Sequence, residues 1–91
     1  MNKRVHLIIT GRVQGVWYRS YTKDKAQKIG LTGWIRNLEN GDVEAIFEGE
    51  EKAIEEMIVW CYSGSPLAEI DDIQTMYEKF SDEFEEFTIQ K

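Results

Sequence analysis

The amino-acid sequence predicts an α+β fold in which one antiparallel sheet of four to five strands carries two helices on one of its faces. Alternating apolar and polar residues mark several short stretches as strands. Two other stretches repeat apolar residues at three- and four-residue spacing, which is typical of amphipathic helices. Turn-forming residues separate these stretches, and the predicted order is β-α-β-β-α-β.

A strand, a loop and a helix make up the first third of the chain. Arg4 to Thr10 alternates apolar and polar residues and predicts a strand. Residues 11–15, with glycine at both ends, predict a loop. Tyr18 to Ile29 predicts a helix, and Gly30 follows in the position where glycine commonly ends helices.

The middle of the chain reads as a β-hairpin. Leu31 to Asn37 predicts the second strand and Asp42 to Glu48 the third. Between them Leu38 to Gly41 contains Asn-Gly, the strongest short-range signal for a tight turn.

The remaining third predicts a helix followed by one or two strands. Glu50 to about Tyr62 has an apolar stripe and begins with acidic residues that suit a helix N-terminus. Ile70 to Tyr77 predicts the fourth strand, and Phe84 to Gln90 predicts a weaker fifth. The element order forms two split βαβ halves, which is the ferredoxin-like layout.

Charge is distributed unevenly along this chain of 91 residues, whose net charge is −6. A basic N-terminal third within an acidic protein indicates a local anion site rather than a nucleic-acid surface. Two differently solvated faces would give the same asymmetry. Residues 1–36 contain one acid and eight of the eleven basic residues, namely Lys3, Arg4, Arg12, Arg19, Lys23, Lys25, Lys28 and Arg36.

Several enzyme classes are excluded by single residue counts. Cys61 is the only cysteine and His6 the only histidine, so zinc hydrolases, Ser-His-Asp enzymes and Cys-His enzymes are not expected. The sequence has no apolar run near the roughly 20 residues that cross a bilayer. Its first residues lack a signal-peptide core, and we expect a cytoplasmic protein with no membrane partner.

The predicted topology brings two distant segments to one edge of the sheet. Strands one and two run parallel with strand three between them, which separates their backbones by about 9–10 Å. We therefore expect the loop after strand one, Arg19 in the first helical turn and Asn37 at the end of strand two to lie together. An extended arginine and a small substrate could bridge that gap.

The loop before the first helix has features of an anion site. Gly11 and Gly15 allow unusual backbone angles, and the loop leads into a helix N-terminus, which favours anions. It lacks the Lys-Ser/Thr ending of a nucleotide P-loop. Taken alone, such a pattern is more typical of an ordinary connecting loop.

Two longer motifs carry a specific resemblance. Gly11-Arg-Val-Gln-Gly-Val-Trp-Tyr-Arg19 and Gly33-Trp-Ile-Arg-Asn-Leu-Glu-Asn-Gly-Asp-Val-Glu44 closely resemble the two signatures of the acylphosphatase family. The resemblance extends to residues 64–72 and so covers nearly the whole chain. It implies that residues 1–91 form a single acylphosphatase-like domain that hydrolyses acyl phosphates to a carboxylate and inorganic phosphate.

The resemblance also implies the roles of individual residues. Arg19 and the loop amides of about residues 13–18 would hold the phosphate, and Asn37 would orient the attacking water. No metal or other cofactor, nucleic acid or membrane is implied, and we expect a monomer. The predicted phosphate-binding loop comprises Gly11, Arg12, Val13, Gln14, Gly15, Val16, Trp17 and Tyr18.

Simpler interpretations and other functions stay open at this point. Arg19 could be a surface residue, Asn37 could merely open the turn, and Cys61 is expected in the core. The domain could bind phosphate without catalysis. A nucleic-acid-binding ferredoxin-like domain is less favoured, because its third strand is usually basic and aromatic whereas this one is acidic.

Overall fold

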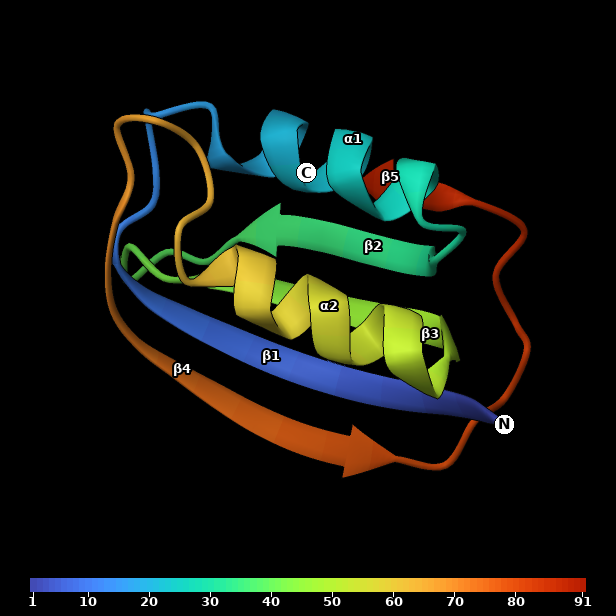
Figure 1. The fold of residues 1–91 in the computed structure, drawn as a ribbon. Coiled ribbons are helices and arrows are strands. Elements are labelled where there is room, and N and C mark those ends of the chain that lie inside the picture. The colour runs from blue at the N-terminus through green and yellow to red at the C-terminus, as the bar shows by residue number, and fades with distance from the viewer.

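The computed structural model describes residues 1–91 and contains two helices and five strands (Figure 1). The predicted β-α-β-β-α-β order is confirmed, and the weaker fifth strand predicted over Phe84 to Gln90 is present as a short strand at Phe87–Ile89. In chain order the elements are β1 (Asn2–Arg12), α1 (Tyr18–Lys28), β2 (Thr32–Asn37), β3 (Val43–Glu50), α2 (Glu51–Cys61), β4 (Glu69–Glu78) and β5 (Phe87–Ile89).

The strands form one sheet in the order β4-β1-β3-β2-β5. As predicted, β3 lies between β1 and β2 and pairs antiparallel with both. The last pair differs from the prediction, because β5 runs parallel to β2 and the sheet is therefore mixed. After β4 the chain crosses one end of the sheet to reach the opposite edge, where Phe87 is fully buried against Phe47.

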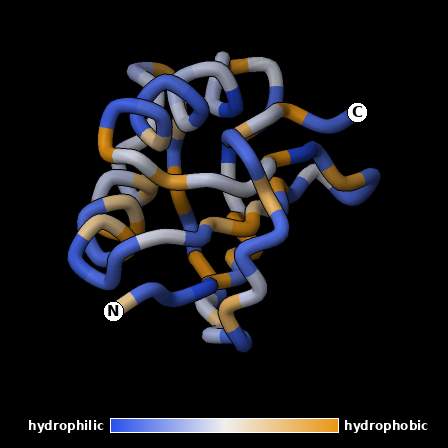
Figure 2. The backbone as a smooth tube through the Cα atoms, turned by 90° about the vertical axis from the view of Figure 1, so that its right-hand side faces the viewer, coloured by the Kyte–Doolittle hydropathy of each residue, from blue (hydrophilic) through white to orange (hydrophobic).

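Both helices cover the same face of the sheet, and the core lies between them and the strands (Figure 1). Alternate residues of β1 (Val5, Leu7 and Ile9) are fully buried there, as their spacing predicts. In Figure 2 the hydrophobic segments lie mostly inside the molecule, and the outer turns are mostly hydrophilic. The opposite face of the sheet carries no helix.

The first strand is longer than predicted, which moves the start of the loop. Gly11 and Arg12 do not begin the loop but pair with β4, after a bulge between Thr10 and Gly11. A Cβ at Gly11 would lie 2.2 Å from the carbonyl oxygen of Glu69, and φ is +136°. Only glycine fits so close to β4, which is a tertiary contact that the local sequence does not reveal.

Candidate active site

The segment from Val13 to Trp17 connects β1 to α1 and has a strongly turned backbone. Gly15 has a φ of +74°, and Trp17, the N-cap residue of α1, has φ +66° and ψ +17°. This left-handed conformation is unusual for a residue with a side chain and costs about 1–2 kcal/mol. No side chain caps α1, so the N–H groups of its first turn are free to donate to an anion.

The loop is fixed in place by buried contacts on both of its sides. The side chains of Val13 and Val16 belong to the core, and the Ser65 hydroxyl donates a hydrogen bond of 2.6 Å to the Val16 carbonyl. The Gln14 amide donates to the carbonyls of Leu38 (2.8 Å) and Asp42 (2.9 Å) in the β2–β3 hairpin. These contacts hold the loop backbone while leaving its outer side open.

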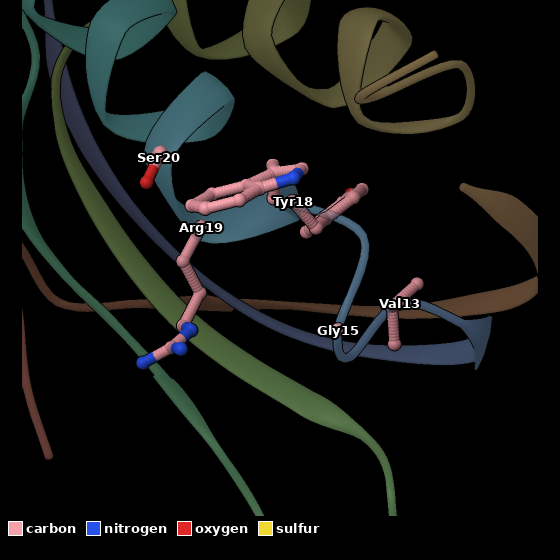
Figure 3. A pocket seen from close by; sticks show the side chains of 6 residues that line it. Val13, Gly15, Tyr18, Arg19 and Ser20 are labelled. Atoms are coloured by element: carbon pink, nitrogen blue, oxygen red, sulfur yellow. The ribbon is translucent and has the colours of Figure 1, made fainter. Parts of the chain in front are cut away.

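A small pocket opens between this loop and the start of α1 (Figure 3). Its volume is about 250 Å³, below the roughly 300–1,000 Å³ of typical ligand sites, and it suits a small substrate. Figure 3 shows the Arg19 guanidinium pointing away from α1, with Gly15 and Val13 across from it. The lining residues are Val13, Gly15, Trp17, Tyr18, Arg19 and Ser20.

Arg19 is the charged residue of the pocket, and no carboxylate pairs with it. None of the ion pairs in the structure involves its guanidinium. The first turn of α1 contains no acidic residue either. A cation at a helix N-terminus opposes the helix dipole, and a bound anion would relieve that conflict.

Asn37 ends β2, as predicted, and one atom of its side chain lacks a partner. Its Oδ1 is buried and accepts no hydrogen bond. Leaving a buried acceptor unpaired costs about 1–3 kcal/mol, so a water molecule donating to Oδ1 would be favourable. Asn37 does not line the Arg19 pocket itself but directly precedes Leu38, to which Gln14 of the loop is bonded.

Tyr18 and Cys61 form a buried pair beneath the pocket. The Tyr18 hydroxyl donates a hydrogen bond of 2.8 Å to the Cys61 carbonyl, and burial raises the pKa of Tyr18. Burial also raises the pKa of the Cys61 thiol to about 12, so it is not a thiolate nucleophile at neutral pH. The expectation that Cys61 packs in the core is confirmed.

Comparison with known proteins identifies the family. The acylphosphatase family model matches residues 5–89. The chain is 43% identical over 86 residues to an acylphosphatase of Pelotomaculum thermopropionicum, with 94% of each protein covered. It is 53% identical over 76 residues to one from Trichormus variabilis, covering 84% of this chain and 75% of that protein. The chain belongs to the acylphosphatase family.

The solved structures of acylphosphatases confirm the ferredoxin-like fold. The crystal structure of acylphosphatase from Bacillus subtilis matches with a TM-score of 0.94 at 32% identity, covering 100% of both chains. Family and fold together support hydrolysis of a small-molecule acyl phosphate. Neither helix is long and apolar enough to span a membrane.

Within the acylphosphatase fold, the ten predicted site residues separate into two groups. Val13, Gly15, Trp17, Tyr18 and Arg19 line the pocket. The other five do not, namely Gly11, Arg12, Gln14, Val16 and Asn37.

Different positions explain why these five lie outside the pocket. Gly11 and Arg12 are in β1, Asn37 is the last residue of β2, Gln14 is bonded to the hairpin, and the Val16 carbonyl is bonded to Ser65. Ser20 also lines the pocket and was missed, although a hydroxyl in the first turn of an anion-binding helix is a usable signal. The roles of all these residues stay predictions.

Proposed function

We propose that the protein hydrolyses the carboxyl–phosphate bond of acyl phosphates by in-line attack of water. The proposal rests above all on Arg19, an arginine without a carboxylate partner that lines a small pocket at an uncapped helix N-terminus. Such a combination favours a phosphate group over other small ligands. The family model, which spans residues 5–89, supports treating the chain as one acylphosphatase-like domain.

In the proposed complex the phosphate lies in the pocket. Backbone N–H groups of the loop and the first turn of α1 donate to its oxygens, and the Arg19 guanidinium donates two further hydrogen bonds. Phosphoryl transfer passes through a loose transition state whose charge spreads over the equatorial oxygens. Fixed donors aimed at these oxygens therefore stabilise the transition state with little reorganisation.

The attacking water is held by Asn37. A water that donates a hydrogen bond to Oδ1 satisfies the buried acceptor, and its own lone pair can then face the phosphorus. Holding a reactant in line removes part of the entropic barrier of a bimolecular step. The unpaired Oδ1 supports this role.

The leaving group needs no acid catalyst in this mechanism. As the water oxygen bonds to phosphorus, the bond from phosphorus to the carboxyl oxygen breaks, and the carboxylate that leaves is stable without protonation at neutral pH. The protons of the water end on the phosphate product. The side chains that usually supply acid–base or nucleophilic catalysis are engaged elsewhere: His6 lies between Glu44 and Glu78, and Cys61 is in the core. We propose accordingly that the reaction needs no metal ion, and we propose separately that the protein is a cytoplasmic monomer.

The decisive experiment is steady-state hydrolysis of benzoyl phosphate in the presence of EDTA. The wild-type protein should turn it over, and Arg19→Gln and Asn37→Ala should lose that activity while circular dichroism shows both variants folded. Full activity in folded Arg19→Gln would refute the mechanism. No wild-type turnover above the spontaneous rate, with phosphate still changing the tryptophan fluorescence of the wild-type protein but not that of Trp17→Phe, would indicate a phosphate-binding module instead.

A further inference from the structure

Gln14 connects the two segments that the proposed reaction needs to keep in register. It belongs to the loop that lines the pocket and precedes Gly15, whereas both of its bonds go to the hairpin that follows Asn37. Its Nε2 donates hydrogen bonds of 2.8 Å to the Leu38 carbonyl and 2.9 Å to the Asp42 carbonyl. The two accepting residues flank the turn between β2 and β3.

Both N–H groups of the Gln14 amide are used by these contacts. A primary amide has two N–H donors, and each has a carbonyl acceptor at normal hydrogen-bond distance. The Gln14 side chain therefore has no donor left for a phosphate. Its function must be exerted through the segments that it joins.

The hairpin end of this junction is rigid. The Asp42 carbonyl also accepts a bond of 2.8 Å from the Leu38 N–H, and Gly41 donates to the Leu38 carbonyl at 3.2 Å. The same two carbonyls thus close the turn and bind Gln14. Any shift of the loop relative to the hairpin would break bonds of 2.8–2.9 Å.

We propose that Gln14 is a positioning residue that sets the distance between the bound phosphate and the water held by Asn37. This inference rests on the proposed function. The loop fixes the phosphate, the strand end before Leu38 fixes the water, and Gln14 is a direct side-chain link between them. In-line displacement is sensitive to such spacing, since a misplacement of about 1 Å can cost ~10²-fold in rate.

A purely structural role predicts a different outcome. If Gln14 only stabilised the fold, its removal would lower the stability and any loss of activity would be the same whether Asn37 is present or not. If it shaped the phosphate-binding pocket, phosphate affinity would fall together with turnover. A positioning role predicts a loss of kcat that depends on Asn37 and leaves phosphate binding nearly intact.

The test uses Gln14→Met, which keeps the length of the side chain without its donors, and Gln14→Glu, which also places negative charge beside two carbonyl oxygens. Hydrolysis of benzoyl phosphate gives kcat, and competitive inhibition by inorganic phosphate gives the affinity of the pocket for phosphate. Gln27→Met is the matched control, because Gln27 donates a long bond of 3.4 Å to the Phe87 carbonyl, away from the pocket.

We expect Gln14→Met to lower kcat by about 10-fold and Gln14→Glu by more, with phosphate affinity changed by less than about threefold. In an Asn37→Ala background, Gln14→Met should cause little further loss, because the residue through which it acts is already gone. Asn37→Ser, whose hydroxyl can still hold a water, serves as the background if Asn37→Ala falls below the spontaneous rate.

Three results would overturn the inference. Unchanged kcat in Gln14→Met, an equal loss in both Asn37 backgrounds, or a parallel loss of phosphate affinity would each exclude the positioning role while leaving the proposed hydrolysis standing. An inactive wild-type protein would instead refute the proposed function, and the positioning role with it.

Discussion

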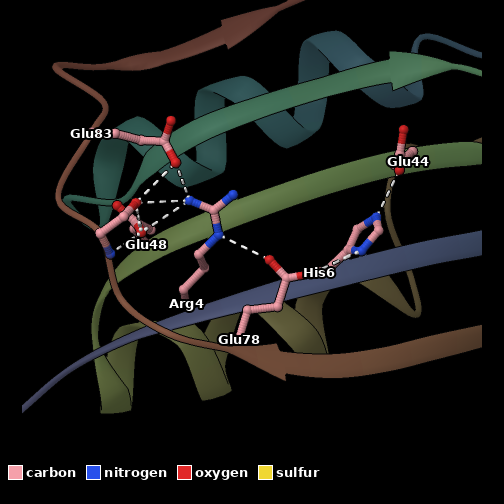
Figure 4. A network of polar contacts seen from close by, with 7 residues as sticks. Arg4, His6, Glu44, Glu48, Glu78 and Glu83 are labelled. Carbon is pink, nitrogen blue, oxygen red and sulfur yellow. Dashed lines mark hydrogen bonds and ion pairs between the residues drawn. The ribbon is translucent and has the colours of Figure 1, made fainter.

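Arg4 and Arg19 belong to the same domain but have opposite surroundings, with Arg4 near the start of β1 and Arg19 in the first turn of α1, beyond the end of that strand. Arg4, near the start of β1, lies among carboxylates on the helix-free face (Figure 4). Its Nε donates a hydrogen bond of 3.0 Å to Glu78, and its Nη1 contacts Glu48, Ser81 and Glu83. Arg19 lines an open pocket with no such partner.

The cluster around Arg4 stabilises the fold. It fixes the chain that crosses from β4 to β5, because Ser81 donates to Glu48 from both its N–H and its hydroxyl at 2.9 Å. The Glu48 side chain is only 1% exposed and depends on these donors. Phe84 packs 5.4 Å from the Arg4 guanidinium in the same cluster.

The difference shows how the two kinds of arginine can be told apart. The Nε and Nη1 donors of Arg4 are bonded to residues up to 79 positions away in the chain, and they contribute to folding. Those of Arg19 are left for a ligand from solution, and the neighbouring Trp17 has a strained backbone. Strain and buried unpaired atoms do not by themselves separate the two regions, because Asp82 beside the Arg4 cluster also has a positive φ and Oε1 of Glu48 also lacks a partner. The free guanidinium of Arg19 is what distinguishes the pocket.

The largest expected effect is that of Arg19→Met on catalysis. We expect kcat/KM for benzoyl phosphate to fall by about 10³-fold or more, since a single arginine on a transferring phosphoryl group is worth that much. The free energy of unfolding should stay within about 0.5 kcal/mol or rise, because a cation leaves a helix N-terminus. Urea unfolding and steady-state kinetics check both values. A loss of stability of several kcal/mol in Arg19→Met would contradict the conclusion that Arg19 serves binding and not folding.

The same substitution at Arg4 should affect stability and not activity. Arg4→Met leaves the buried Glu48 without its cation and should lower the free energy of unfolding by about 3 kcal/mol. We expect kcat/KM to be unchanged in the folded fraction. The double variant Arg4→Met/Glu48→Leu should recover much of the stability, and failure to do so would mean that the charge pair is not the cause.

A smaller effect, in this case a gain of stability, is expected from a substitution at Trp17, the residue of the loop with a strained backbone. Trp17→Gly removes the left-handed strain, and little packing is lost because the side chain is 73% exposed. Part of the gain is offset by the larger entropy of glycine in the unfolded chain, which leaves about 0.5–1 kcal/mol. The gain is measured as the difference in thermal unfolding between Trp17→Gly and Trp17→Ala, because alanine at this position keeps the strain.

The smallest expected effect is the response of the helix-free face to acid. Burial raises the pKa of Glu44, but hydrogen bonds from Arg36 and His6 outweigh it, and the net pKa lies below the ordinary 4.5. Hydrogen bonds from Arg4 and Ser81 likewise lower the pKa of Glu83. Their contribution to stability is therefore present above about pH 4.5 and is lost as the pH falls through the lowered values.

Arg36→Met isolates the part of this acid response that belongs to Glu44. Arg36 donates a hydrogen bond of 2.7 Å to Glu44, so the variant should raise the pKa of Glu44. The free energy of unfolding should then fall less steeply as the pH is lowered below about 4.5. Denaturant unfolding at several pH values gives the slope. An unchanged slope would show that Arg36 does not set the Glu44 pKa.

Much of the architecture follows from local sequence. The alternation along β1, the apolar spacing of α1 and the Asn-Gly turn are short-range patterns, and they predicted the element order and the helix-covered face. They also placed Arg19 in the first turn of a helix after a glycine loop and Asn37 at the end of a strand.

Contacts between distant residues decided the rest. The three-residue β5 has no local signal of its orientation, and it runs parallel to β2 because Phe87 is buried against Phe47 after the chain has crossed the sheet. Gly11 joins β4 through a bulge, and Gln14 reaches the hairpin 24 and 28 residues away. The sequence thus determined which residues could bind an anion, whereas tertiary packing decided which donors were left free, because a hydrogen bond across the sheet leaves no trace in local periodicity.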